Sequence, residues 1–162
     1  MRQSSLFGVT LRQDPKDAHS MAHRLLLRGG FIKPLSSGLF AFMPKLARVL
    51  DSLSDLIRGE LNILAFAPFD LPVLRPKAAL EQSEPWTLQP GEALGLRDRR
   101  GAGLSLGTGN EALFAELVRS EVSSVRQLPR RVQLCSPIFR DEDGFRNSLL
   151  RLRESRTIQA LS

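Results

Sequence analysis

The stretch "LVRSEVSSVRQLP" at residues 117–129 decides the fold, together with "FRDE" at 139–142. Apolar residues at helical spacing lead into it, which predicts an amphipathic helix on Leu113, Phe114, Leu117, Val118 and Val122. The segment "VQLCSPIF" at 132–139 is rich in strand-forming residues and reads as a strand interrupted by Pro137. Helix, loop and strand thus lead into the charged cluster Arg140–Asp143.

Further elements are predicted upstream of this stretch. Residues 45–62 carry apolar side chains at helical spacing, which is the clearest helix pattern in the chain. Residues 17–30 predict a helix that ends in a glycine pair and has an apolar face of Ala18, Met21, Ala22, Leu25 and Leu26. His23 borders that face, which favours a hydrogen-bonded structural histidine over a chemical one.

Strands are predicted between and after these helices. "SGLFAFMP" (37–44) alternates like a short strand, and another strand begins at Leu104 and Leu106. "AFAPFDLPVLRP" (65–76) contains three prolines, so it suits a sheet edge or a subunit interface better than a central strand.

Composition limits the function. The chain has 162 residues, which suits one domain, and a net charge of +6 from 23 basic and 17 acidic residues. Eight arginines and four acids lie between Arg126 and Arg156, so this segment carries 8 − 4 = +4. One cysteine excludes an internal disulfide and a cysteine-based zinc cage, and no metal site is readable.

Targeting signals are weak. No apolar run is long enough for a membrane span, and no signal peptide is readable at the start. The cytoplasm is therefore the expected location. A mitochondrial location stays open as an alternative, because Arg2 and Arg12 precede the first acid, Asp14.

The two quoted stretches resemble a bacterial-type prolyl-tRNA synthetase. The likeness extends through "DAHSMAHRLLLRGG" (17–30), "SGLFAFMP" (37–44), "LPVLRP" (71–76) and "LRDRRG" (96–101). The resemblance implies an α+β fold, a partial class II aminoacyl-tRNA synthetase core in which helices flank an antiparallel sheet. Residues 1–162 would form a single truncated catalytic domain with motifs 1 and 2, without motif 3 or an anticodon-binding domain.

The resemblance also implies roles for particular residues. "LDSLSDLIRGELN" (50–62) through "LPVLRP" resembles motif 1, through which such enzymes dimerise, and Pro72 stands where that motif has its proline. "FRDE" resembles motif 2. Arg140 would then act catalytically, offsetting charge on the amino-acid carboxylate and the α-phosphate, and Glu142 would accept a hydrogen bond from adenine. Glu111 would bind the ammonium of proline.

Several ligand-facing positions depart from the family pattern. Arg151 and Arg153 stand where the family has arginines near the nucleotide phosphates, but Ser155 replaces the aromatic residue that stacks on adenine. The family's Pro-Thr-His-Glu-Glu reads Thr-Gly-Asn-Glu-Ala here, so Gly109 replaces a threonine that helps to hold proline. Thr108 to Glu111 fits a helix capping box instead. These losses suggest relaxed catalysis on a retained scaffold.

Three functions follow from this pattern. The favoured one is a non-catalytic, structural or RNA-contacting subunit of a larger assembly such as a ribonucleoprotein or ribosome. The alternatives are a fragment or split half of a proline–tRNA ligase, and a regulatory partner of a true synthetase. Activity of the chain alone is not expected, and ATP and Mg²⁺ would be needed only by an active ligase. Arg140–Glu142 could also be merely a surface ion-pair cluster.

Two kinds of partner are expected. A protein partner would cover the incomplete core and the motif 1 surface. RNA would bind the basic positions with little sequence preference, whereas membrane and DNA are not expected. The predicted RNA-binding set is Arg126, Arg130, Arg131, Arg146, Arg151, Arg153 and Arg156.

Overall fold

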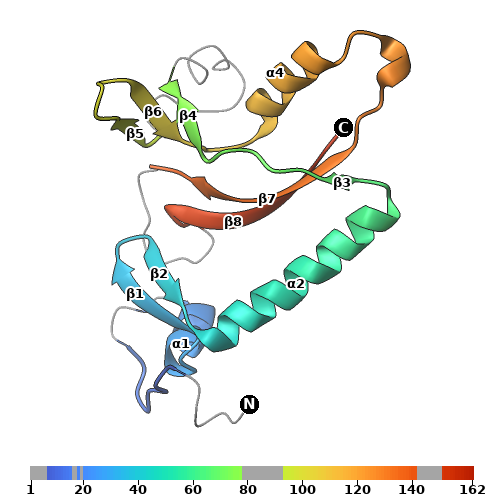
Figure 1. Cartoon of the computed structure of the whole chain (residues 1–162). Helices are drawn as coiled ribbons and strands as arrows, with labels where there is room; N and C mark the ends of the chain where they lie inside the picture. Colours follow the sequence, from blue (N-terminus) through green and yellow to red (C-terminus); the bar gives the residue numbers. More distant parts are fainter. Residues whose placement is uncertain (1–6, 16–17, 19, 78–92, 142–150) are drawn as a thin grey trace. The chain divides into compact units, whose positions relative to one another are not determined.

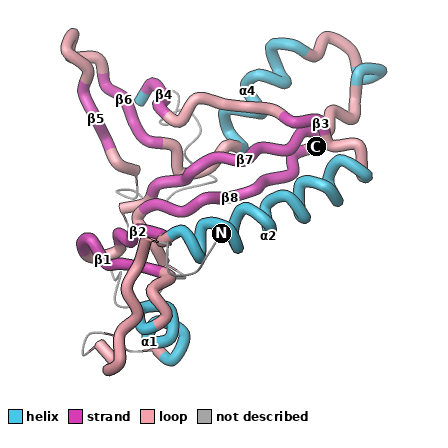
Figure 2. The backbone as a smooth tube through the Cα atoms, turned by 60° about the horizontal axis from the view of Figure 1, so that its bottom comes forward, coloured by secondary structure: helices cyan, strands magenta, loops and turns pink. Residues whose placement is uncertain are grey.

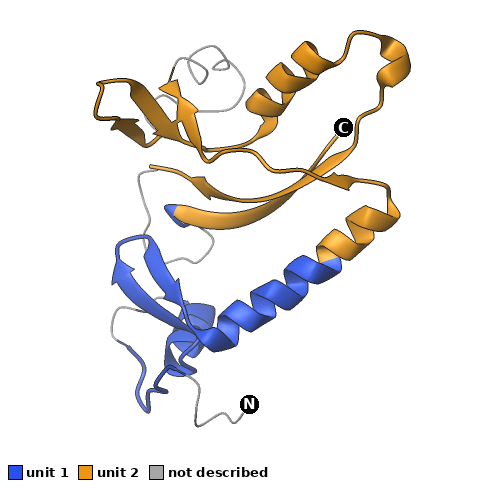
Figure 3. Ribbon diagram, viewed as in Figure 1, with its two compact units in different colours: residues 1–56, 143–153 blue, residues 57–142, 154–162 orange. Residues whose placement is uncertain are grey.

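The computed structural model describes residues 7–15, 18, 20–77, 93–141 and 151–162 (Figure 1). The chain divides into two compact units, residues 1–56 with 143–153 and residues 57–142 with 154–162 (Figure 3). Helix α2 (Pro44–Ile63) contributes residues to both units. The single-domain interpretation stays a prediction.

The first unit contains helix α1 (Met21–Arg28) and a hairpin of strands β1 (Ile32–Ser36) and β2 (Leu39–Phe42). The hydroxyl of Ser20 caps α1 by accepting from the amide of His23 at 3.1 Å, and the helix ends at the glycine pair, as predicted. Gly30 has a φ of +65°, which glycine adopts without strain.

The apolar face predicted for residues 17–30 is buried only in part, since Ala18 is buried and Leu26 packs against the core. Met21 and Leu25 are exposed, whereas His23 and Leu27 are buried. Leu27 joins Ala18 and Ile32 in the core of this unit, so the buried face of the helix is rotated from the one that the apolar spacing indicates. The short helix carries leucines on several sides, and its contact with the hairpin decides which of them are buried.

His23 is buried against an aromatic ring, and its side chain makes no hydrogen bond within the described residues. Its ring packs edge-on against Phe40 with centroids 5.5 Å apart. Within the described residues, neither ring nitrogen has a hydrogen-bond partner. The expectation of a hydrogen-bonded histidine was therefore wrong, because an aromatic contact occupies the place of a polar partner.

The second unit is built on two three-stranded sheets (Figure 2). In the first, β7 (Val132–Phe139) lies between β3 (Ala67–Pro68), which is parallel to it, and β8 (Glu154–Leu161), which is antiparallel. In the second, β6 (Gly103–Leu106) lies between β4 (Leu74–Pro76) and β5 (Gly95–Arg97), both antiparallel to it. The proline-rich strands β3 and β4 are edge strands in the described sheets, as predicted.

The helix predicted before β7 is α4 (Glu111–Glu121), and a 3-10 turn, η2 (Val125–Gln127), follows it. Helices and mainly antiparallel sheets confirm the α+β class. None of the helices in the described ranges is long and apolar enough to cross a membrane.

Pro137 is accommodated by the direction of its backbone. The amide of Phe139 donates to Gly107 at 2.9 Å and the carbonyl of Gln133 accepts from Phe69, so odd-numbered positions of β7 bond on the side away from β8. Proline has no backbone N–H. At position 137 that group would point away from β8, so its absence breaks no hydrogen bond to β8.

Helix α2 carries an exposed apolar face. Val49, Leu53, Leu56 and Ile57 recur at helical spacing and are 47–64% exposed. The buried residue of this helix is Ser54, whose hydroxyl donates to the carbonyl of Leu50 at 2.7 Å. The helix prediction is confirmed, and these four apolar side chains remain about half exposed in the described structure.

Candidate functional site

A buried guanidinium supports the loop before α4. Arg75 of β4 is 6% exposed and donates through Nη1 to the carbonyl of Gly109. Its Nη2 donates to Oδ1 of Asn110 at 2.6 Å. Because one planar group bonds a backbone carbonyl and a side chain together, Arg75 fixes the conformation of the loop at residues 108–110.

Asn110 extends this network to the first sheet. Its Nδ2 donates to Oγ of Ser136 on β7 at 2.9 Å and also contacts Oε1 of Gln159 on β8. Nε2 of Gln159 in turn donates to Oε1 of Glu111 at 2.7 Å. The loop, the first residue of α4 and both long strands are thus joined by side-chain hydrogen bonds.

The capping-box interpretation of Thr108 and Glu111 was wrong. The helix begins at Glu111, its N-cap is Asn110, and the Asn110 side chain makes no capping bond. That side chain is instead 2% exposed and is held by Arg75 and Ser136. A buried amide that satisfies a buried guanidinium outweighs a local cap, because the guanidinium would otherwise lose a partner.

Two glycines make room for the network. A Cβ on Gly107 would lie 2.8 Å from Nη2 of Arg75, and one on Gly109 would meet the carboxylate of Glu111. Burial lowers the pKa of Arg75, and the nearby Glu111 carboxylate opposes that shift. The guanidinium stays charged at neutral pH.

An apolar cavity of about 600 Å³ borders Glu111. Its apolar wall is formed by Phe114, Ala115, Val118, Leu128, Pro129 and Leu161. The cationic side chains of Arg119 and Arg130 also line it. A carboxylate beside an apolar cavity suits a small ligand that combines an ammonium group with a hydrocarbon body.

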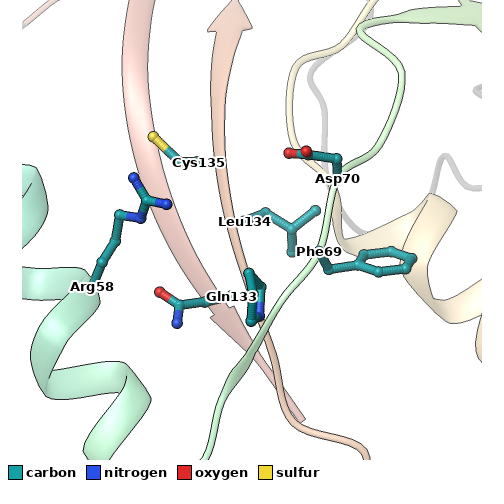
Figure 4. Close-up of a pocket in the computed structure, with 7 residues that line it drawn as sticks. Arg58, Phe69, Asp70, Gln133, Leu134 and Cys135 are labelled. Carbon is teal, nitrogen blue, oxygen red and sulfur yellow. The ribbon is translucent and has the colours of Figure 1, made fainter.

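A smaller polar cavity of about 150 Å³ lies beside β7 (Figure 4). Gln133, Leu134 and Cys135 of β7 line it together with Arg58 of α2. Nε2 of Gln133 donates to Asn62 at 2.6 Å and to the carbonyl of Phe66 at 3.0 Å. Its buried Oε1 has no donor within the described residues, and the cavity is large enough for water.

Comparison with known proteins shows which sequences and folds this chain resembles. The chain is 40% identical over 156 residues to a proline–tRNA ligase of Synechococcus sp. (strain JA-3-3Ab). It is 38% identical over 153 residues to the proline–tRNA ligase of Mycobacterium tuberculosis. Each alignment covers 94% of this chain and 26% of the relative. The chain is thus similar in sequence to proline–tRNA ligases over nearly its whole length.

The chain spans about a quarter of the length of these curated relatives. A solved prolyl-tRNA synthetase of Cryptosporidium parvum, complexed with halofuginone and AMPPNP, superposes with a TM-score of 0.74. That match has 16% identity and covers 93% of this chain and 31% of the solved one. A solved threonyl-tRNA synthetase RNA-binding domain from the same organism gives 0.73 at 24% identity, covering 83% and 34%. No family model matches.

Described side-chain contacts place only one of the predicted substrate residues, Glu111, in the network above. Glu111 is exposed, and its carboxylate belongs to the Arg75 network. Arg140 is exposed directly after β7, and Arg151 is exposed before β8. Arg153 is half-buried, and its backbone amide donates to Gly38 at 3.1 Å. Glu142 lies outside the described residues.

The predicted RNA-binding arginines differ in their described surroundings. Arg126, Arg130 and Arg156 are exposed, and Arg146 lies outside the described residues. Nη1 of Arg131 donates to the carbonyl of Leu64 at 3.3 Å, and its guanidinium lies 6.0 Å from the ring of Phe66. Arg131 therefore has a structural role between the end of α2 and β7. RNA binding by the seven arginines stays a prediction.

No role for the side chain of Arg75 was predicted from the sequence. Its position in "LPVLRP" marks it only as part of a strand. A signal was present in the two glycines that flank Thr108, because paired small residues before a helix can indicate the close approach of a bulky group. Among the described residues, no group of three or more histidine, cysteine or acidic side chains could hold a metal ion.

Proposed function

We propose that this chain forms the proline-binding part of a class II aminoacylation core, as a fragment of a proline–tRNA ligase. The rest of the core would come from a longer form of the chain or from a second polypeptide. The observation that carries the proposal is the carboxylate of Glu111, held by Gln159 at the rim of an apolar cavity. The hydrocarbon ring of proline would occupy the cavity, and its ammonium would pair with Glu111.

Arg140 would complete the chemistry after β7. Adenylate formation brings the proline carboxylate to the α-phosphate of ATP, so a guanidinium there offsets negative charge on both groups. The sequence resemblance assigns Arg140 this role and Glu142 the adenine contact, with ATP and Mg²⁺ as the required co-reactants. Arg151 and Arg153 would lie near the nucleotide phosphates.

A chimeric ligase tests this function. We expect the isolated chain to show no proline-dependent ATP–pyrophosphate exchange, because it spans only a quarter of its relatives. Proline-dependent exchange should appear in a chimera in which this chain replaces the homologous segment of the Synechococcus ligase. The unmodified Synechococcus ligase is the positive control. A folded chimera without measurable exchange would contradict the proposal.

A non-catalytic, RNA-contacting role is the second candidate. Gly109 has no hydroxyl for a substrate, and the side chain of Asn110 is committed to Arg75 and Ser136. Ser155 on β8 offers no aromatic ring for adenine. This candidate predicts an inactive chimera that still binds RNA, which separates it from the ligase proposal.

The apolar face of α2 would join two copies of the chain. Burying a leucine from each copy contributes about 1.5–3 kcal/mol per side chain, so we expect Leu53→Glu with Leu56→Glu to weaken self-association at least tenfold. Asp55→Lys with Arg58→Glu, on other positions of the same helix, is the matched control. Sedimentation equilibrium measures both. A wild-type chain that stays monomeric at high concentration would count against this interface.

A further inference from the structure

The hairpin of β5 and β6 has an exposed basic tip. Arg97, Arg99 and Arg100 are all exposed. Among the described residues, none of these three side chains forms an ion pair. Three exposed arginines therefore lie within a span of four residues.

The acidic residue of the tip is occupied by the turn itself. Oδ1 of Asp98 accepts from the backbone amides of Arg100 and Ala102, both at 2.8 Å. The amide of Gly101 donates to the carbonyl of Asp98 and the amide of Asp98 donates to the carbonyl of Ala102, both at 3.1 Å, and Gly101 has a φ of +84°. The carboxylate thus fixes the loop and makes no described contact with the arginine side chains, which leaves the tip with a charge of 3 − 1 = +2.

We propose that this tip, Arg97–Arg100, binds the phosphate backbone of RNA. Guanidinium groups match phosphate oxygens in a bidentate geometry, and a turn fixed by four hydrogen bonds presents them with little loss of backbone entropy. Residues 98–102 contain no large apolar side chain that could insert into a membrane. The preference for RNA over other polyanions rests on the proposed function, whereas phosphate recognition rests on the hairpin alone.

This surface differs from the arginines at positions 126–156. It lies on the second sheet of the unit, at the end of a hairpin whose strands pair Arg97 with Gly103. A phosphate contact here carries no base information, so binding should be independent of sequence and sensitive to salt.

The test compares two triple variants with the same change in charge. R97A/R99A/R100A should bind an unmodified proline tRNA transcript at least tenfold more weakly than wild type. The log–log salt slope should flatten by about 2, since each lost phosphate contact removes roughly 0.7–0.9. The control R12A/K33A/R58A removes three other exposed cations and should change the slope by less than about 1.

A lysine variant separates charge from folding. R97K/R99K/R100K keeps the cations and should keep most of the salt slope, with weaker affinity from the lost bidentate geometry. Equal losses in the hairpin and control triples would overturn the proposal, as would binding to anionic vesicles without binding to RNA. These measurements use no proline or ATP, so their outcome is independent of the exchange assay on the chimera.

Discussion

Arg75→Ala is expected to destabilise the second unit by about 2–4 kcal/mol. The change leaves the carbonyl of Gly109 and Oδ1 of Asn110 without their donor, and it opens a cavity where a side chain was 6% exposed. Buried polar groups left unpaired cost about 1–3 kcal/mol, and large-to-small changes in a core add a cavity cost. Urea unfolding followed by circular dichroism measures the loss.

Arg97→Ala is the matched control, because it removes the same side chain from an exposed position of the same sheet. Its effect should stay within about 0.5 kcal/mol. Arg75→Lys should be intermediate, since an ammonium keeps the charge but cannot bond both acceptors in one plane. Equal stability of the Arg75 and Arg97 alanine variants would show that the network does not hold the loop.

A double-mutant cycle adds a specific test of the network. Arg75→Ala and Asn110→Ala should show a coupling above about 0.5 kcal/mol, because the two side chains bond directly. Arg75→Ala and Glu116→Ala involve separate elements and should be additive. Additivity of the first pair would contradict a shared network.

The elements that sequence predicted correctly are those with a strong local pattern. Helix α2 has apolar residues at helical spacing over five turns, and β7 has a run of strand formers, so both are confirmed. The prolines of β3 and β4 correctly indicated edge strands. In each case the decisive information lies within one segment.

The elements that failed depend on contacts between segments. The burial of α1 is set by its packing on the hairpin, which exposes Met21 and buries His23. The Thr108–Glu111 cap competes with Arg75, which lies more than thirty residues earlier in the chain. Local spacing cannot reveal such a competitor, and a resemblance that treats "LPVLRP" as a strand does not reveal the partner of its arginine either.

The candidate site shows the same division. The resemblance to prolyl-tRNA synthetases is confirmed by the similarity to curated proline–tRNA ligases, and it proposed Glu111 as the substrate carboxylate. It did not predict the hydrogen bond from Gln159 to that carboxylate or the burial of the Asn110 side chain against Ser136. Both contacts cross from the loop to β8 or β7, so they depend on the register of strands that are distant in sequence.

Glu111→Gln in the chimera is expected to lower kcat/KM for proline by roughly 10²–10³-fold, which corresponds to about 2.7–4 kcal/mol. The substitution keeps the shape of the side chain and an oxygen that can accept from Gln159, so the network survives. It removes the negative charge that would attract the ammonium of proline. A purely structural Glu111 would therefore tolerate the change, whereas a substrate-binding Glu111 would not.

The KM values for proline and for ATP should show which of the two substrates Glu111 contacts. The KM for proline should rise, and the KM for ATP should stay close to that of the parent chimera, because the lost charge would face the amino acid. Glu116→Gln removes a carboxylate from an exposed position of the same helix and should leave both constants near their parent values. If Glu111→Gln and Glu116→Gln gave equal rates of ATP–pyrophosphate exchange, Glu111 would be a loop-supporting residue, and the cavity beside it would have no role in binding proline.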